Sequence, residues 1–265
     1  MDLAGLTFER WRSLDLDAAR RLAGEAASGV GGRVRRIETV RHLGAPLHRV
    51  LIEREGRDFA LVPGGRVRLG FDPQVWRPTP EQEADYAESL AEGFGFAPDL
   101  TSHLAGELSP VRTVELATVL MAVEDEALTG PPDDVPAGLA GQGMRLPSAD
   151  EWEHACGAGA RTLFRWGDTC PLDEEPYGGG GIRHEPNAFG LHIAYDSYTA
   201  ELSGDREAVH GGDAGSAACG GYGRLMGWLP LATAQRNPGT AEFVYGPEGE
   251  DVWDDFSVRP VLTLP

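Results

Sequence analysis

The N-terminal part of the chain has the pattern of a helix followed by a β-hairpin. Across residues 8–28, Leu14 and Leu22 mark one apolar stripe of a helix, with arginines on the opposite side and glycines directly after it. Residues 34–40 and 48–53 alternate apolar and polar positions around a Gly-Ala-Pro turn, as half-buried strands do. These patterns predict one amphipathic helix and two paired strands.

Shorter patterns continue this organisation through the middle of the chain. A Pro-Gly-Gly turn separates two apolar stretches, a Thr-Pro pair is typical of a helix start, and a stretch rich in glycine and proline follows later. The expected elements are strands at 59–62 and 67–69, a helix at 80–92, a strand pair within 111–123 and a flexible connector at 130–143.

The clearest local signal follows this connector. Ser148 and Glu151 form a capping box, in which each side chain is expected to accept a hydrogen bond from the other residue's backbone amide. Trp152 begins the apolar face of the predicted helix, and a Gly-Ala-Gly sequence ends it. Arg145 precedes the helix and is placed to pair with the carboxylate of Glu151 or Glu153. We interpret these residues as structural.

Glycine and aromatic residues dominate the C-terminal part. Gly178–Gly181 form an uninterrupted run, and further glycines crowd residues 211–223. Such a composition is often disordered, but tryptophans, tyrosines and phenylalanines are interleaved with the glycines. Aromatic residues at this density indicate packed irregular loops.

The chain is strongly acidic, with 42 Asp and Glu against 23 Lys and Arg and a formal charge of −19. This charge repels nucleic acids and anionic membranes, and no apolar run is long enough to span a bilayer. Solubility is its simplest role, and a basic or metal-bearing partner is the alternative. Because the start, Met1-Asp2-Leu3-Ala4, lacks a basic segment followed by an apolar one, we expect a cytoplasmic protein that binds neither nucleic acid nor membrane.

One segment departs from this acidity. Residues 31–57 carry seven arginines against three glutamates, mixed with apolar residues as in a strand pair. A solvated strand face is the more frequent use of such a charge run, and a local anion site is the alternative.

The three cysteines, Cys156, Cys170 and Cys219, are widely spaced. No CxxC pair or clustered Cys/His spacing occurs, so a structural zinc site is not expected. In a cytoplasmic protein these cysteines would be reduced thiols.

Taken in order, the motifs of residues 59–265 resemble the formylglycine-generating enzyme family, also called the sulfatase-modifying-factor domain. The likeness is closest for MRLPSADEWEHA at residues 144–155. The other matching stretches are FALVPGGRVRLGFD at 59–72, FRWGD at 164–168, PNAFGL at 186–191 with Asn187 at its second position, and, more weakly, VHGG at 209–212 and SVRPV at 257–261. Each motif is short, and their common order is what makes the resemblance specific.

The resemblance implies a C-type-lectin-like fold with small twisted sheets, little regular secondary structure and long ordered loops. It therefore implies an α+β protein of bacterial type in which residues 58–265 form the domain similar to the formylglycine-generating enzyme. Residues 1–57 would be an added helix and hairpin.

The chain departs from the family at the positions that carry its chemistry. The family holds copper with two cysteines just after the Gly-Gly that corresponds to residues 211–212. Ser216 and Gly221 occupy those positions here, and Cys219 matches neither. Two soft thiolates suit Cu(I), whereas a serine hydroxyl does not. We therefore expect neither copper nor formylglycine-generating activity.

The family's calcium-binding segment is also replaced in this chain. Residues 194–201 lack the asparagine and both tryptophans that the resemblance places there. Asp196, Glu201 and Asp205 still provide oxygen atoms of the kind that Ca²⁺ prefers. Calcium thus stays an alternative to simple solvation of these side chains.

These departures favour a recognition protein. A lectin-like scaffold tolerates loop replacement, so the glycine-rich loop at 211–223 would form the recognition surface for a protein, peptide or small-molecule ligand. Tyr222, Trp228 and Arg236 are the candidate ligand-binding residues. A scaffold subunit of a larger complex is a related interpretation, to which no particular residue points.

The alternative is an enzyme of the same fold with altered chemistry, thiol- or metal-dependent. Its candidate catalytic residues are His210, Asp213, Ser216 and Cys219, because a thiol beside a histidine can act as a nucleophile. A lone cysteine between alanines and glycines is more often a small buried apolar residue. A thiol in a cleft, within hydrogen-bond reach of His210 or Asp213, would favour the enzyme, and a buried Cys219 would favour recognition.

Overall fold

The computed structural model describes residues 3, 5–247 and 249–265. Its strands are β1 (Arg33–His42), β2 (Ala45–Arg54), β3 (Arg57–Val62), β4 (Gly65–Leu69), β5 (Arg112–Leu116), β6 (Val119–Ala122), β7 (Glu126–Ala127), β8 (Ala200–Leu202), β9 (Val209–His210), β10 (Phe256–Val258) and β11 (Val261–Thr263). Its helices are α1 (Phe8–Arg12), α2 (Leu16–Gly29), α3 (Pro80–Ala91), α4 (Leu100–Glu107), α5 (Val135–Ala140), α6 (Ala149–Gly157), α7 (Ser216–Cys219), α8 (Arg224–Trp228) and α9 (Pro238–Val244). Short 3-10 helices are η1 (Pro132–Asp134), η2 (Ile182–His184), η3 (Leu229–Leu231) and η4 (Gly249–Asp255).

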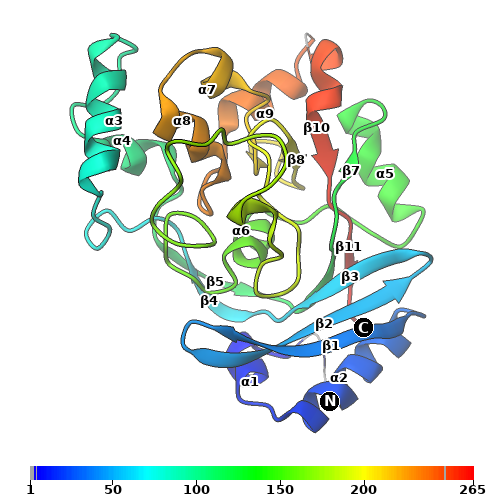
Figure 1. The fold of residues 1–265 in the computed structure, drawn as a ribbon. Coiled ribbons are helices and arrows are strands. Elements are labelled where there is room, and N and C mark those ends of the chain that lie inside the picture. Colours follow the sequence, from blue (N-terminus) through cyan, green and yellow to red (C-terminus); the bar gives the residue numbers. More distant parts are fainter. Residues whose placement is uncertain (1–2, 4, 248) are drawn as a thin grey trace.

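The described strands form sheets of mainly antiparallel pairs, which makes the protein α+β. The largest sheet has the order β1-β2-β3-β6-β11, with every neighbouring pair antiparallel. A second sheet, β7-β10-β8-β9, contains the parallel pair of β8 and β10, and β4 pairs with β5 in a third. Figure 1 shows α6 in the middle of the molecule, with the large sheet below it and α7, α8 and α9 above.

The N-terminal hairpin is part of the large sheet. β2 pairs with β3, so that Leu51 lies opposite Ala60, and α1 and α2 lie against β1 and β2 on the side away from α6 (Figure 1). The indole of the buried Trp11 donates from Nε1 to the carbonyl oxygen of His48 at 2.9 Å. The described residues of the segment 1–57, which was predicted as an extension, thus share one hydrophobic core with the rest of the described chain.

The single helix expected at residues 8–28 is in fact two helices. α1 ends at Arg12, and the Asp15 side chain starts α2 by accepting a hydrogen bond from the Ala18 amide at 2.7 Å. An aspartate in this position favours a new helix start, because it satisfies an amide that lacks a partner within the helix. The buried residues of α2 are Ala19, Leu22, Ala23, Ala26 and Ala27.

The two strands expected as a pair within residues 111–123 belong to different sheets. β5 pairs with β4, whereas β6 lies between β3 and β11. The backbone passes very close to Gly64 at this crossing, since a Cβ at Gly64 would lie 2.2 Å from the carbonyl oxygen of Leu116. Only glycine permits such an approach. The connector expected at 130–143 contains α5, and α4 was not expected at all.

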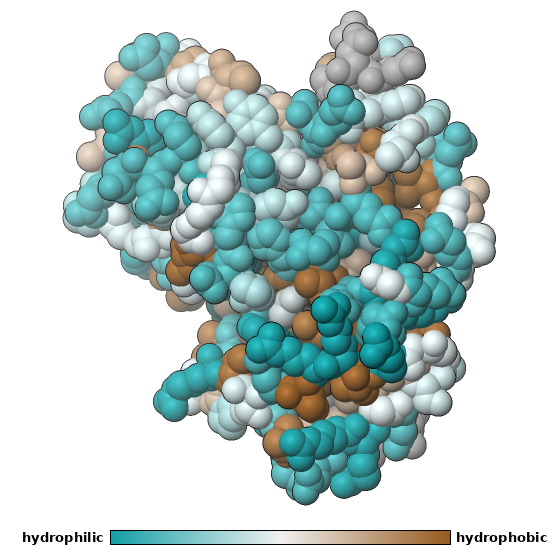
Figure 2. Space-filling view, turned by 45° about the vertical axis from the view of Figure 1, so that its right-hand side comes forward, coloured by the Kyte–Doolittle hydropathy of each residue, from teal (hydrophilic) through white to brown (hydrophobic). Residues whose placement is uncertain are grey.

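Figure 2 shows a face that is largely hydrophilic, with hydrophobic side chains gathered in a few small areas. No helix within residues 3, 5–247 and 249–265 combines the length and the apolar character needed to cross a bilayer. Met1, Asp2 and Ala4, on which the expected lack of a secretion signal rests, lie outside the described residues.

Candidate functional site

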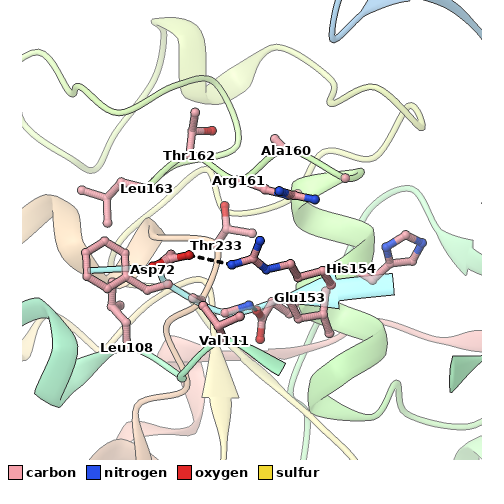
Figure 3. Close-up of a pocket in the computed structure, with 17 residues that line it drawn as sticks. Asp72, Leu108, Val111, Glu153, His154, Ala160, Arg161, Thr162, Leu163 and Thr233 are labelled. Carbon is pink, nitrogen blue, oxygen red and sulfur yellow. Dashed lines mark hydrogen bonds and ion pairs between the residues drawn. The ribbon is translucent and has the colours of Figure 1, made fainter. Parts of the chain in front are cut away.

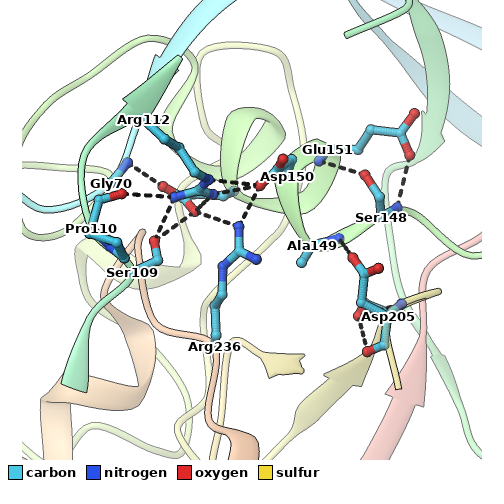
Figure 4. Close-up of polar contacts among 12 residues, drawn as sticks. Gly70, Ser109, Pro110, Arg112, Ser148, Ala149, Asp150, Glu151, Asp205 and Arg236 are labelled. Atoms are coloured by element: carbon cyan, nitrogen blue, oxygen red, sulfur yellow. Dashed lines mark hydrogen bonds and ion pairs between the residues drawn. The ribbon is translucent and has the colours of Figure 1, made fainter. Parts of the chain in front are cut away.

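Helix α6 organises the polar side chains at the centre of the molecule (Figures 3 and 4). Both hydrogen bonds of the predicted capping box are present: Ser148 Oγ accepts from the Glu151 amide at 3.1 Å, and Glu151 Oε2 accepts from the Ser148 amide at 2.9 Å. Arg145 donates to both carboxylate oxygens of Glu151, each at 2.6 Å. Trp152 is fully buried, and its Nε1 donates to Glu201 Oε2 at 2.8 Å. These contacts fix the helix against its surroundings.

Two further acidic residues of α6 bind arginines from distant segments (Figure 4). Arg112 Nη2 lies 2.6 Å from Asp150 Oδ1 and 2.5 Å from Glu153 Oε2. Arg236 also pairs with Asp150, and its Nη2 lies 3.5 Å from Glu153 Oε2. Burial alone would raise the pKa of Asp150, but hydrogen bonds from the two arginines hold that pKa below its ordinary value. Arg236, a candidate ligand-binding residue, is therefore engaged in the scaffold, and Arg145 pairs with Glu151 alone.

A small cavity lies beside this network (Figure 3). Its walls include Arg68, Asp72, Glu153 and Thr233, and Arg68 is itself paired with Asp72 at 2.6 Å. The cavity has a volume of about 40 Å³. Since one water needs roughly 10–15 Å³ on this scale, the cavity has room for a few waters and is too small for an organic ligand.

Asn187, the second residue of the PNAFGL motif, connects α6 to the loop that follows. Its Oδ1 accepts hydrogen bonds from the three successive amides of residues 189–191. Its Nδ2 donates to the carbonyl oxygens of Ala155 and Cys156 at the end of α6. Because the buried amide is fully used in this way, Asn187 stabilises the fold and is not available to a ligand.

The three candidate calcium ligands do not converge on one point. Asp196 accepts from a nearby backbone amide at 2.9 Å, and Asp205 Oδ2 accepts from the Ala149 amide at 2.7 Å, as Figure 4 shows. Glu201 is buried and paired with Arg259 at 2.6 Å. Within the described ranges, no group of three or more His, Cys, Asp or Glu is arranged to hold a metal ion. Each of these carboxylates already binds a backbone amide or an arginine.

The structure does not bring His210 and Cys219 together. His210 is fully buried, stacks on Trp152 with 4.6 Å between ring centroids, and places Nδ1 2.8 Å from the carbonyl oxygen of Gln235. Burial lowers the pKa of His210 to about 3. Cys219 is exposed, and its Sγ lies 3.4 Å from the hydroxyl oxygen of Tyr198. Cys219 is therefore not the buried thiol that would favour recognition, and its hydrogen-bond partner is Tyr198 and not the His210 or Asp213 that would favour the enzyme.

Asp213 and Ser216 lie at the start of α7 and face a common pocket. Asp213 Oδ2 accepts from the Ala217 amide at 2.8 Å, which holds the short helix in place. Burial raises the pKa of the Asp213 carboxyl, and hydrogen bonds from backbone amides at the start of α7 oppose this effect.

This pocket lies between the α3–α4 connection and residues 213–237, and its volume is about 510 Å³. Phe94 and Phe96 come from the connection, and Tyr222 comes from the turn between α7 and α8. The ring centroid of Tyr222 is 4.9 Å from that of Phe94 and 5.7 Å from that of Phe96. Ligand pockets typically measure about 300–1,000 Å³, and this volume lies within that range. We call this cavity the aromatic pocket and regard it as the candidate functional site.

The polar wall of the aromatic pocket offers hydrogen-bond acceptors. Asp213 and Glu107 are its acidic members, and no Lys or Arg lines it in the part of the chain that the structure describes. Gln235 is 7% exposed, and its Oε1 has no hydrogen-bond donor among the described residues. A buried acceptor without a donor costs about 1–3 kcal/mol. A water or a ligand with N–H groups would remove this cost.

A second hollow, of about 640 Å³, adjoins the aromatic pocket at Tyr222, which lines both. Its wall carries the acidic residues 173–175 and a single cation, Arg224. Acidic residues thus outnumber basic ones in this second hollow, as they do in the aromatic pocket. Trp228, the remaining candidate ligand-binding residue, is fully buried and belongs to the core.

Sequence reasoning missed the half of the aromatic pocket that precedes α6. Phe94, Phe96 and His103 line it, and none of them was a candidate. The available signal was the Phe-Gly-Phe sequence at 94–96, because two aromatic residues in a short connection between helices need a partner surface.

Comparisons with known proteins leave the family of this chain open. No protein-family model matches the chain, and no curated protein matches it. The resemblance to the formylglycine-generating enzyme family therefore rests on the short motifs of the sequence and on the order in which they occur.

Proposed function

We propose that this protein is a non-catalytic recognition protein that binds an organic cation with a flat apolar part in the aromatic pocket. We further propose that it is a divergent relative of the formylglycine-generating enzymes with a C-type-lectin-like core. The observation that carries the ligand assignment is the pocket wall, where aromatic rings meet acids and acceptors, with no Lys or Arg among the described residues that line it.

Three physical effects favour a cation in this pocket. The faces of aromatic rings attract positive charge, here those of Phe94, Phe96 and Tyr222. The carboxylate of Asp213 adds a direct electrostatic attraction, and the unpaired Oε1 of Gln235 accepts an N–H group. An anion would meet repulsion from the same wall, so the pocket discriminates by charge as well as by shape.

The proposed relationship to the family draws support from the roles of the motif residues. Arg145 and Glu151 hold the start of α6, and Asn187 holds its end. Arg145, Glu151 and Asn187 thus all hold the same helix in place, which gives a structural reason for these motif residues to occur together. Partners, on this proposal, are a small molecule or a basic side chain of a peptide.

Titration with phenethylamine tests the ligand class, because it joins a ring to an ammonium group. We expect phenethylamine to bind in calorimetry, and phenylacetate, which has the opposite charge, not to bind. Asp213→Asn keeps an oxygen for the Ala217 amide and should weaken binding about tenfold or more, since a hydrogen bond to a charged group contributes roughly 1.5–3 kcal/mol. Tyr222→Ala should weaken it too.

Phe243→Ala is the matched control for this titration, since Phe243 is 40% exposed on α9 and lies outside the pocket wall. Its affinity for phenethylamine should equal that of the unaltered protein. Equal binding of phenylacetate and phenethylamine would contradict the assigned charge. No binding of phenethylamine at all would contradict the proposed site.

Binding should also weaken as the pH falls. The cation needs ionised Asp213, whose pKa lies above its ordinary value because of burial, so affinity should be lost at a higher pH than an exposed aspartate would give. Burial lowers the pKa of His103, which also lines the pocket, and its protonation in acid would add repulsion. Affinities measured from neutral to acidic pH test this, and the affinity of Asp213→Asn should depend less on pH than that of the unaltered protein.

We expect no conversion of a Cys-x-Pro-x-Arg peptide to formylglycine, with or without Cu(I). Ser216 offers a hard hydroxyl, Gly221 offers no side chain, and Cys219 is a single thiol, so the residues present do not fit the copper ion that the resemblance implies. Burial raises the pKa of both Cys156 and Cys170 to about 12, so neither is a ready thiolate. Mass spectrometry of the incubated peptide measures the aldehyde. An aldehyde that disappears in Cys219→Ala would favour the enzyme instead.

A further inference from the structure

Another cavity, of about 220 Å³, lies between the β1–β2 hairpin and the loop of residues 165–188. Its lining includes three arginines, Arg41, Arg49 and Arg165, and one acid, Glu185. We call this cavity the arginine pocket. It is where the arginine-rich strands meet the C-terminal part of a chain whose formal charge is −19. The wall of this pocket therefore carries more basic than acidic residues, although the whole chain is acidic.

The arginines of this pocket differ in how they are paired. Arg49 Nη1 lies 3.1 Å from Glu38 Oε1, and Glu38 also pairs with Arg36 at 2.8 Å. Arg165 is only partly exposed, and its buried Nε has no hydrogen-bond acceptor among the described residues. Its guanidinium carbon lies 5.4 Å from the ring centroid of Trp166. Burial lowers the pKa of Arg165, and the charges of Cys156 and Glu185 oppose this effect only in part.

Arg41 is the second unpaired cation. Its side chain is exposed at the rim, and it forms no ion pair within the described part of the chain. Glu185 is exposed, and Arg165 donates from Nη2 to the carbonyl oxygen of Arg183, which leaves its Nε free. Two positive charges thus face one cavity, and a buried N–H group there lacks an acceptor, which costs about 1–3 kcal/mol.

An oxyanion satisfies both features at once. It would accept from the free Nε of Arg165 and would pair with the charge of Arg41, and the forked guanidinium group matches phosphate geometry. At 220 Å³ the cavity is smaller than the roughly 300–1,000 Å³ typical of sites for larger ligands. Trp166 and Ile182 add an apolar side to the same cavity. The occupant is therefore small, with one charged end and a short remainder.

We propose that the arginine pocket binds the phosphate group of a small phosphate ester. This site shares no lining residue with the aromatic pocket. Its occupation is therefore independent of the proposed function, and either assignment can fail without the other.

Titration with inorganic phosphate at low ionic strength tests the site. We expect saturable binding at one site per chain in calorimetry. The ring signals of His42 should move with it in nuclear magnetic resonance, because His42 lines the pocket and its Nε2 lies 2.9 Å from the carbonyl oxygen of Ala158. Arg41→Gln and Arg165→Gln should each weaken binding about tenfold or more.

Arg21→Gln is the matched control, since Arg21 is exposed on α2 and its replacement removes the same charge elsewhere. It should leave the affinity for phosphate unchanged. If Arg165→Gln fails to fold, Arg41→Gln decides, because Arg41 is exposed. The proposal is overturned by absence of saturable binding, by acetate binding as tightly as phosphate, or by an equal loss of affinity in Arg21→Gln and Arg41→Gln.

Discussion

Replacement of Trp152 by alanine is expected to lower the free energy of unfolding by about 3–5 kcal/mol. The indole is fully buried in α6, stacks on His210, and donates from Nε1 to Glu201 Oε2 at 2.8 Å. Its removal would leave a cavity in the core and take a donor away from a buried carboxylate, and both effects destabilise the folded state. Urea denaturation followed by circular dichroism measures the change.

Phe243→Ala provides the control, because Phe243 is an aromatic residue with 40% exposure at the surface of α9. Truncation there should cost less than about 1 kcal/mol, as for most surface substitutions. If Trp152→Ala cost no more than this control, Trp152 would not be a core residue, and the structural interpretation of the MRLPSADEWEHA motif would fail with it.

Glu201→Ala is expected to destabilise the protein by about 3–5 kcal/mol, because it leaves the charge of Arg259 buried without its main partner. The side chain of Arg259 is 0% exposed and that of Glu201 is 3% exposed, with 2.6 Å between Nη2 and Oε1. Asp125 is more distant, at 3.4 Å from Arg259. Thermal and urea denaturation would both report the loss.

The exposed pair of Arg206 and Asp133 is the matched control for this prediction. Their side chains are 60% and 59% exposed, so Asp133→Ala should change stability by only about 0–1 kcal/mol. Glu201→Gln should lie between the two, since it keeps an acceptor for Arg259 and loses the charge. Equal effects of Glu201→Ala and Asp133→Ala would show that the buried pair contributes little.

Local patterns predicted much of the regular structure. The capping box depends only on Ser148 and Glu151, which are three residues apart at the start of one helix. Both residues of this signal can therefore be recognised in the sequence alone. The alternating segments 34–40 and 48–53 were also recognised from a local pattern, and they lie within β1 and β2. The break before α2 was missed although Asp15 is a good capping residue, because the apolar stripe appeared continuous through it.

What could not be predicted depends on contacts between distant segments. The alternation within 111–123 indicates strands, but it does not indicate that β5 and β6 join different sheets. The aromatic pocket needs Phe94 beside Tyr222, and the chain between them gives no sign of this proximity. Asp205 was an alternative calcium ligand because of its residue type, and only the fold shows that it binds an amide of α6.

The buried pair of Arg259 and Glu201 also bears on the order of events during synthesis. The two residues are 58 positions apart, and a ribosome adds about 5–20 residues per second. Glu201 is therefore made roughly 3–12 seconds before the arginine that neutralises it. Until then β8 has no β10 beside it, β6 has no β11, and the carboxylate has to stay in water. A nascent chain of this protein should thus complete its core late, and chaperones that hold exposed apolar segments would act on it during that interval.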